Sequence, residues 1–189
     1  MVRHSNGKPP ILVDMDGVLA DFVLSYITIW NERYGDQHPM KRDMWSYTIP
    51  DNAPAHLREQ ASAISYERGF FLNLHPIPGG IEAIHELERL GHPVRLCTMP
   101  LEGSAYVILE KQQWAERHLG RGWKQKTLIV PDKTLVHGRI LIDDNPDIVG
   151  HQQPTWEHVL YDAPYNQHVN DKRRITWENW KEGLADLLQ

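Results

Sequence analysis

Short apolar runs alternate with longer helical patterns along the chain, and this alternation predicts the order of its elements. Runs typical of short buried strands stand at Ile11–Val13, Val94–Cys97, Thr127–Val130, Arg139–Ile142 and His158–Tyr161. Patterns with a helical period stand at Val18–Tyr34, Ala55–Arg68, Ile81–Leu90, Ser104–Leu119 and Thr176–Leu188. A glycine directly follows each of these helical patterns except the last, as expected at a helix end, and Thr176 is expected to cap the last helix.

Strands that alternate with helices are typical of an α/β fold with a doubly wound, mostly parallel, Rossmann-like sheet. Part of the chain interrupts this alternation, because residues 36–54 are rich in aspartate, proline and aromatic residues and have no clear period. We therefore expect a core domain of residues 9–30 and 74–189, with residues 31–73 inserted after the first strand as a small, mainly helical cap. Ligands of such sheets bind at the carboxyl ends of the strands, over which this insertion would lie.

The composition favours a soluble globular protein and restricts the kinds of ligand that it can bind. The chain has 189 residues, 41% of them hydrophobic and 24% charged, which suits one soluble globular domain with a small subdomain. Acidic residues outnumber Lys and Arg by 25 to 20, which argues against a long nucleic acid but allows a small phosphorylated ligand. No apolar run reaches the length of a membrane span, and no signal-peptide core is present. The one cysteine, Cys97, excludes an intramolecular disulfide and favours a cytoplasmic protein.

Two pairs of aspartates supply the first candidate chemistry. Asp14 and Asp16 follow the first predicted strand, and Asp143 and Asp144 follow a later one. Clustered carboxylates repel one another, so they are costly at converging strand ends unless a cation lies among them. Mg²⁺ prefers such oxygen ligands, and Gly17 would let the backbone turn behind the first pair. The alternative is that Asp14 and Asp16 begin a turn and cap the next helix, but the second acidic pair favours a metal site.

Two further polar residues stand near predicted strand ends. Thr98, after Val94–Cys97, could donate a hydrogen bond to a phosphate oxygen, and Lys133 could neutralise both phosphate and carboxylates. Taken alone, Thr98 is more typical of an ordinary strand end, and Lys133 is more typical of a surface lysine. They gain weight because they occur in order with the acidic pairs, at strand ends that converge on one crevice.

This ordered set of DxD, Thr, Lys and a paired acid resembles the haloacid dehalogenase superfamily. The segments DMDGVLADF, LCTMP, DKT and LIDDNPD, with WEHVLYDAPYNQH downstream, are similar to those of the 5'(3')-deoxyribonucleotidase family. The similarity extends over most of the chain, from Ile11 to about His168, and is poor between Asn31 and Gly69 except around MWS. DMDGVLADF combined with LIDDNPD is specific, whereas DKT or LCT alone is a weak signal.

The resemblance implies a haloacid dehalogenase-type fold and a Mg²⁺-dependent phosphatase that hydrolyses nucleoside monophosphates. It implies that Asp14 attacks phosphorus and forms an aspartyl-phosphate, while Asp16 protonates the leaving oxygen and then activates water. It also implies that Asp14, the main-chain carbonyl of Asp16 and Asp144 hold Mg²⁺, with Asp143 behind them. The sequence leaves open which member of the later pair binds the metal directly.

The same resemblance implies residues that bind the substrate, a small-molecule phosphate monoester. Thr98 and Lys133 would hold the phosphoryl oxygens. Phe22, Met44 and Trp45 match family positions that line the nucleobase pocket; ordinary hydrophobic packing is the alternative for these three, above all for Met44. Dimers are common in such families, which implies a possible homodimer.

Three positions depart from the family pattern. Met99 stands where the family has Ser after the motif threonine, Asn145 where Arg follows the paired acid, and Pro131 where Arg can precede the lysine. These changes leave the phosphatase chemistry intact but remove a potential base contact and phosphate donors. The preferred nucleotide therefore stays open.

Other functions remain as alternatives. A phosphatase of the same mechanism could act on a sugar phosphate or another small phosphomonoester. A phosphorylatable receiver domain also combines an acidic pocket with Thr and Lys, but it carries its acid pair at the first strand and its phosphorylated aspartate at a middle one. A phosphate-binding pseudoenzyme is disfavoured because the full set of catalytic residue types is present.

Overall fold

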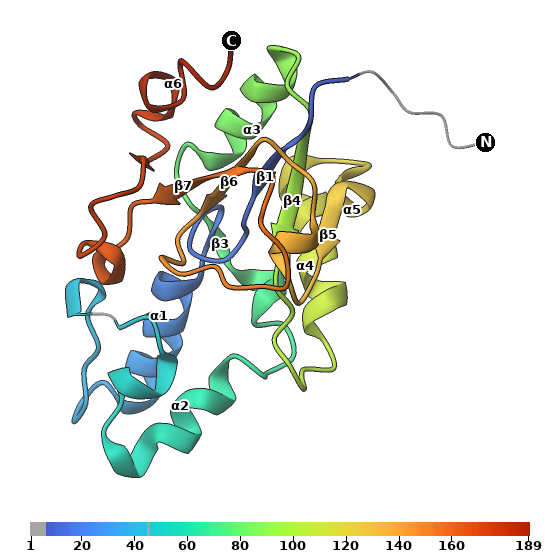
Figure 1. The fold of residues 1–189 in the computed structure, drawn as a ribbon. Helices are drawn as coiled ribbons and strands as arrows, with labels where there is room; N and C mark the ends of the chain where they lie inside the picture. The colour runs from blue at the N-terminus through green and yellow to red at the C-terminus, as the bar shows by residue number, and fades with distance from the viewer. Residues whose placement is uncertain (1–6, 45) are drawn as a thin grey trace.

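A six-stranded sheet forms the centre of the computed structural model, which describes residues 7–44 and 46–189 (Figure 1). The strand order is β5-β4-β1-β6-β7-β8, and every neighbouring pair is parallel. The strands are β1 (Ile11–Val13), β4 (Val94–Thr98), β5 (Thr127–Ile129), β6 (Ile140–Asp143), β7 (Glu157–Tyr161) and β8 (Arg174–Ile175). The predicted α/β fold with a mostly parallel sheet is confirmed. Of the six strands in this sheet, only β8 was not predicted, because its two residues are too few to form a pattern.

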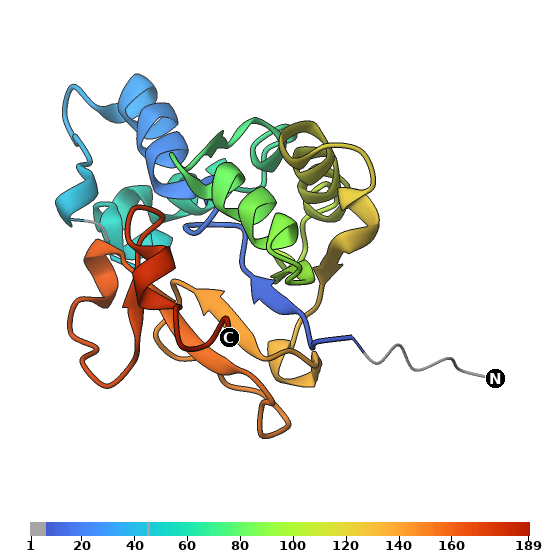
Figure 2. The same cartoon turned by 90° about the horizontal axis from the view of Figure 1, so that it is seen from above.

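Apolar side chains cover both faces of this sheet. Leu12 and Leu141 are fully buried in one cluster, whereas their strand neighbours Ile11 and Ile140 belong to the larger core, because successive side chains of a strand point to opposite faces. The larger core includes α3 (Gly80–Arg89) and α4 (Val107–Leu119), which Figure 2 shows on the same face. Loop residues around the short helix η5 (Lys133–Leu135) pack on the other face.

The chain leaves the sheet after β1 and returns to it through α3. An antiparallel pair, β2 (Ala20–Asp21) and β3 (His75–Pro76), joins the two ends of this excursion. Between them lie α1 (Phe22–Tyr34), η1 (Arg42–Met44), η2 (Ile49–Asn52), η3 (Ala55–Leu57), α2 (Arg58–Ile64) and η4 (Phe71–Asn73). The excursion is mainly helical, as expected, and the domain boundaries at residues 31 and 73 stay a prediction.

Several helix boundaries differ from the prediction for local reasons. α1 begins four residues later than Val18, because the backbone N–H groups of residues 18–20 all bond to the Met15 carbonyl in a tight turn. A four-residue helix, α5 (Trp123–Lys126), was not predicted because it is too short to show a period. In the described part of the chain, no helix is long and apolar enough to span a membrane.

The predicted helix at Thr176–Leu188 is wrong over most of its length. Only α6 (Trp180–Gly183) is helical there, and its N-cap residue is Asn179, not Thr176. Trp177 and Trp180 are both buried, and the Trp177 indole donates to the Val18 carbonyl at 2.7 Å. Packing of these large side chains onto the core therefore outweighs the helical propensity of the segment.

His92 gives the fold a predicted dependence on pH. Its ring is 5% exposed, and its Nδ1 accepts a hydrogen bond from Arg139 at 2.8 Å, which requires a neutral imidazole. Burial, aided by Arg139, lowers the pKa of His92 below its ordinary 6.5. The unfolded chain therefore binds this proton more readily, and the free energy of unfolding falls as the pH drops through 6.5.

His92→Gln removes the titrating group. We expect the stability of wild type relative to this variant to fall between pH 8 and pH 5, with a slope of at most about 1.4 kcal/mol per pH unit. Urea unfolding at several pH values measures the difference. A constant difference across this range would show that His92 is not held neutral by the fold.

Candidate active site

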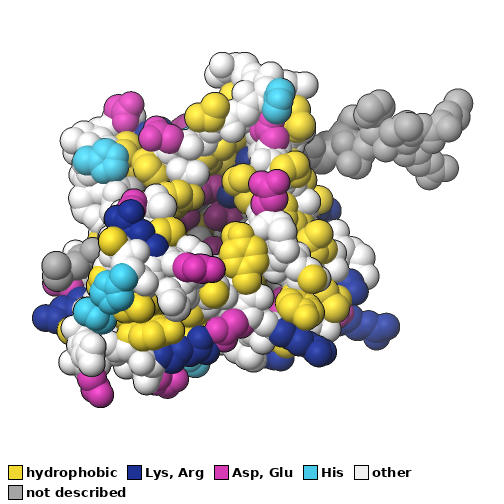
Figure 3. All heavy atoms as spheres, turned by 90° about the horizontal axis from the view of Figure 1, so that it is seen from below, with side chains coloured by type: hydrophobic (Ala, Val, Ile, Leu, Met, Phe, Trp, Pro, Cys, Tyr) yellow, Lys and Arg dark blue, Asp and Glu magenta, His cyan; other side chains and the backbone are white. Residues whose placement is uncertain are grey.

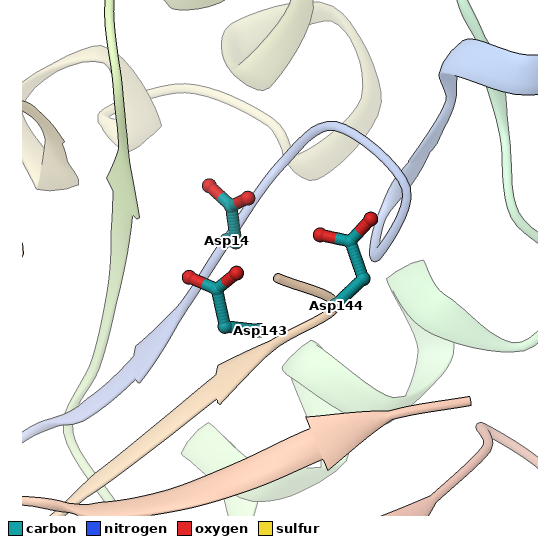
Figure 4. A group of neighbouring side chains, drawn as sticks. All are labelled: Asp14, Asp143 and Asp144. Carbon is teal, nitrogen blue, oxygen red and sulfur yellow. The ribbon is translucent and has the colours of Figure 1, made fainter. Parts of the chain in front are cut away.

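Three aspartates from two neighbouring strands meet at the carboxyl edge of the sheet. Asp14 directly follows β1, Asp143 is the last residue of β6, and Asp144 follows it; β1 and β6 are adjacent in the sheet. One carboxylate oxygen from each residue lies within 4.8 Å of those of the other two, and all three residues are buried (Figure 4). The predicted convergence of the two acidic pairs is therefore present in the structure.

Lys133 bridges two of these aspartates. Its Nζ lies 2.9 Å from Asp14 Oδ1 and 2.5 Å from Asp143 Oδ2, and the residue is buried. Burial alone would lower the pKa of Lys133, but the carboxylates of Asp14 and Asp143 outweigh it and raise the pKa above the ordinary range. Asp132 accepts hydrogen bonds from Thr134 and His151, and so fixes the loop from which Lys133 projects.

Lys111 is a second buried ammonium, and sequence reasoning missed it. It lies on α4, is 2% exposed, and its Nζ contacts Asp16 Oδ2 at 2.8 Å. The same Nζ donates to Thr98 Oγ1 at 2.8 Å and to the Met99 carbonyl at 2.7 Å. The available signal was its place on the apolar stripe of the helix, between Val107 and Trp114 at spacings of four and three residues.

Asp16 has one paired and one unpaired oxygen. Oδ2 contacts Lys111, whereas Oδ1 is buried and has no hydrogen-bond partner among the described residues. Burial, with a smaller contribution from Asp14, raises the pKa of Asp16 above its ordinary value despite the nearby lysine. A carboxyl group in this state is suited to both giving and taking a proton.

The charges of this site leave room for a divalent cation. If the carboxylates of Asp14, Asp16, Asp143 and Asp144 are all ionised, the two ammonium groups of Lys111 and Lys133 leave two negative charges uncompensated. Burial raises the pKa of Asp143 to about 6, and burial together with Asp143 and Asp14 raises the pKa of Asp144. The oxygen ligands, their spacing and the uncompensated charge all fit a hard cation.

The two later aspartates differ in how their oxygens are engaged. Asp143 Oδ2 bonds Lys133, and its Oδ1 accepts from the Asn145 backbone N–H at 3.0 Å. Asp144 Oδ2 accepts from the Tyr165 hydroxyl, while no described residue is recorded as bonding its Oδ1. Asp144 is thus the member of the pair with an oxygen available to a metal.

The other predicted site residues either line one crevice or lie outside the part of the chain that the structure describes. Thr98 is 1% exposed at the end of β4, and it accepts from Lys111, so its own hydroxyl proton is free for donation. Phe22 lines the crevice with Tyr47 and Ile49 of the excursion. Figure 3 shows a hollow with acidic side chains at its bottom and hydrophobic ones around it. Trp45 and the side chain of Met44 lie outside the described part.

The positions that depart from the family pattern lie close together. Met99 and Asn145 line the crevice, and they also line an adjoining pocket that Pro131 shares. Met99 is 47% exposed. Met99 and Asn145 therefore border the crevice itself, whereas Pro131 lies only in the adjoining pocket, which Lys133 also lines.

Comparison with known proteins gives closely similar sequences over nearly the whole chain. A family model described as "5' nucleotidase, deoxy (Pyrimidine), cytosolic type C protein" matches residues 8–188. A putative 5'(3')-deoxyribonucleotidase of Bordetella bronchiseptica is 46% identical, covering 94% of this chain and 96% of the relative. The human mitochondrial 5'(3')-deoxyribonucleotidase is 37% identical, covering 90% of this chain and 80% of its own.

Solved structures with low sequence identity share the fold. A putative haloacid dehalogenase-like hydrolase from Burkholderia xenovorans superposes with a TM-score of 0.56 at 14% identity, over 97% of this chain and 99% of the other. A haloacid dehalogenase family hydrolase from Deinococcus radiodurans, solved with bound phosphate and sodium, superposes with a TM-score of 0.54 at 14% identity, over 96% of this chain and 97% of its own.

The Gly17 backbone lies close to Asp144. Its φ is +76°, and a Cβ added there would lie 2.2 Å from Asp144 Oδ2. Gly17→Ala therefore meets both a strained backbone and a clash, and we expect it to lower the free energy of unfolding by more than the ~1–2 kcal/mol of the left-handed conformation alone.

Gly91→Ala is the matched control for this experiment. Gly91 has a φ of +83°, but an added Cβ would meet no atom within 4 Å, so the variant experiences only the backbone strain. Denaturant unfolding of both variants in metal-free buffer measures the excess. Equal losses of stability would contradict a close approach of Asp144 to the Gly17 backbone.

Proposed function

Because the chain belongs to the 5'(3')-deoxyribonucleotidase family of haloacid dehalogenase-type hydrolases, we propose that it is a Mg²⁺-dependent phosphatase of nucleoside monophosphates, with 5'- and 3'-deoxyribonucleotides as preferred substrates. The observation that carries this proposal is the arrangement of Asp14, beside Lys133 and two further acids, with the proton-exchanging group Asp16 two residues away. The whole set lies at the bottom of one crevice.

Asp14 is the nucleophile in this proposal. A carboxylate oxygen of Asp14 attacks phosphorus, the bond from phosphorus to the nucleoside oxygen breaks, and an aspartyl-phosphate forms. Lys133, at 2.9 Å from Asp14 Oδ1, orients the carboxylate and offsets the negative charge that the phosphate brings. Water then attacks the phosphorus of the intermediate, which restores the Asp14 carboxylate and releases inorganic phosphate.

Asp16 transfers the protons of both steps. Its raised pKa supports a protonated carboxyl group that donates to the leaving nucleoside oxygen. The resulting carboxylate then takes a proton from the attacking water, so that one proton leaves and one returns in each cycle. Lys111 contacts Oδ2 of Asp16, while Oδ1 has no hydrogen-bond partner among the described residues and is the oxygen proposed to exchange the proton.

Asp14, Asp144 and the main-chain carbonyl of Asp16 would hold Mg²⁺. A cation held there would supply Lewis-acid stabilisation of the negative charge on the phosphate oxygens. Asp143 has both oxygens engaged by Lys133 and the Asn145 N–H, which supports a role behind the metal ligands. Thr98 and Lys133 would hold phosphoryl oxygens beside the ion.

The excursion that follows β1 is the proposed cap that selects the substrate. Phe22, Tyr47 and Ile49 supply an apolar wall to the crevice, which favours a nucleobase over a bare sugar. Met44 and Trp45 belong to the same part of the proposal. Asn145, Met99 and Pro131 replace potential donors, so the preferred base is left to experiment. A cytoplasmic location and a homodimer complete the proposal.

Phosphate release from a panel of substrates tests this function. We expect turnover of dUMP, dTMP and 3'-deoxyribonucleotides with Mg²⁺, weaker turnover of UMP, and none in EDTA. Turnover of sugar phosphates alone would retain the mechanism and reject the nucleotide. Absence of turnover for every ester, with a phospho-aspartate that persists for minutes, would instead favour a receiver-like or phosphate-binding module.

Asp14→Asn is expected to abolish turnover, since the amide is not a nucleophile. The variant should remain folded, because the substitution relieves repulsion among buried carboxylates while Asp143 still pairs Lys133. Steady-state assays and circular dichroism measure the two properties. An active Asp14→Asn preparation, free of contaminating phosphatase, would rule out the covalent mechanism.

Asp16→Asn is expected to slow both half-reactions by about 100- to 10,000-fold, the usual contribution of general acid–base catalysis. Rapid-quench measurement of intermediate formation and decay separates the two steps. A substrate with a better leaving group, such as p-nitrophenyl phosphate, should recover formation of the intermediate but not its hydrolysis. Normal rates with dUMP would contradict the role of Asp16.

A further inference from the structure

Two adjacent residues of a short helix contact Asp144, although the sequence analysis assigned neither of them to the site. The helix η6 (Pro164–Asn166) follows β7, and its last two residues are Tyr165 and Asn166. The Tyr165 hydroxyl donates to Asp144 Oδ2, and Asn166 Nδ2 donates to the Asp144 main-chain carbonyl at 2.9 Å. One residue thus holds the side chain of this aspartate and the next holds its backbone.

Both the nitrogen and the oxygen of the Asn166 side chain make hydrogen bonds within the fold. It is fully buried, and its Nδ2 also donates to the Tyr161 carbonyl at 2.8 Å. Its Oδ1 accepts from the Ala163 N–H at 3.1 Å and from Arg174 at 2.6 Å. A fully satisfied buried amide is a rigid anchor, because any displacement leaves buried polar groups unpaired.

Tyr165 adds an orientation that the backbone alone does not supply. The Tyr165 hydroxyl is the donor in this contact, because an ionised carboxylate oxygen can only accept a hydrogen bond. This donation engages Oδ2, so Oδ1 is the oxygen that stays available to a cation. The Gly17 backbone lies close to the same carboxylate on its other side. A Cβ added at Gly17 would lie 2.2 Å from Asp144 Oδ2 and 3.0 Å from the Tyr165 hydroxyl.

We propose that Tyr165 and Asn166 are positioning residues that preorganise Asp144 as a ligand of the divalent cation. This inference rests on the proposed function for the identity of the metal. Residues that orient a ligand through its second oxygen typically change metal affinity by about 10- to 100-fold when they are removed.

The same tyrosine connects the metal ligand to the excursion. The rings of Tyr47 and Tyr165 lie 5.5 Å apart between centroids, in an edge-to-face arrangement. Tyr47 also lines the crevice. A side chain that touches the substrate space therefore packs directly on the residue that orients Asp144.

Calorimetric titration of the metal-free protein with Mg²⁺ tests the proposal. Tyr165→Phe keeps the ring and its contact with Tyr47 but removes the donor, and we expect its Kd for Mg²⁺ to rise about 10- to 100-fold. Tyr165→His retains a donor on a smaller ring and should bind Mg²⁺ more tightly than the Phe variant. An equal loss in both variants would show that a hydrogen-bond donor at position 165 does not govern Mg²⁺ binding, and would overturn the proposal.

Tyr161→Phe is the matched control. Tyr161 is a tyrosine near η6 that is buried, whereas Tyr165 is partly buried, and among the described residues no hydrogen bond joins the Tyr161 hydroxyl to an aspartate of the cluster. This variant should lose stability without a change in Kd for Mg²⁺. In Tyr165→Phe, excess Mg²⁺ should restore kcat with dUMP to near the wild-type value, which a purely structural defect would not allow.

The outcomes separate this inference from the proposed function. Wild-type protein that turns over dUMP, with an unchanged Kd in Tyr165→Phe, would overturn only the positioning role. Wild-type protein that binds Mg²⁺ but hydrolyses no nucleotide would overturn only the proposed function. Failure of the wild type to bind Mg²⁺ would overturn both.

Discussion

Mutual repulsion among buried carboxylates is the constraint on which the site depends. Asp14, Asp143 and Asp144 place oxygens within 4.8 Å of one another, away from water. Isolated charges in such a place would neutralise by binding protons, and the raised pKa values of Asp143 and Asp144 report that tendency. Two buried lysines compensate part of the charge, and the proposed cation would compensate the rest. The same imbalance that destabilises the metal-free protein would therefore provide the affinity for the ion.

The fold meets this constraint with elements that are distant in sequence. Neighbouring parallel strands β1 and β6 deliver the aspartates to one edge. Lys111 comes from α4 and Lys133 from the loop at η5, so each ammonium is fixed by packing that is independent of the acids. Gly17 allows the backbone to pass close to Asp144. A site built in this way is rigid before any ligand binds, which is how preorganised charges stabilise a transition state.

Sequence reasoning found the part of this site that depends on local pattern. Apolar runs that end in Asp14 or Asp143 can be read directly, because strand ends of a parallel sheet converge. Lys111 was not found, because its contact with Asp16 is made across space and the lysine lies within a helix that otherwise suggests packing. Tyr165 lies in the segment WEHVLYDAPYNQH that carries part of the family resemblance, but its contact with Asp144 is also made across space and was not predicted. The prediction of the last helix was wrong for a different reason, because burial of Trp177 and Trp180 outweighed the helical pattern.

Anomalous diffraction from crystals grown with Mn²⁺ tests the central claim most directly. Mn²⁺ prefers the same oxygen ligands as Mg²⁺ and its position can be identified without ambiguity. We predict one anomalous peak per chain within coordination distance of Asp14 and Asp144, with Asp143 still bound to Lys133. A cluster without a peak at saturating Mn²⁺, or a peak coordinated by Asp143 in place of Asp144, would contradict this prediction.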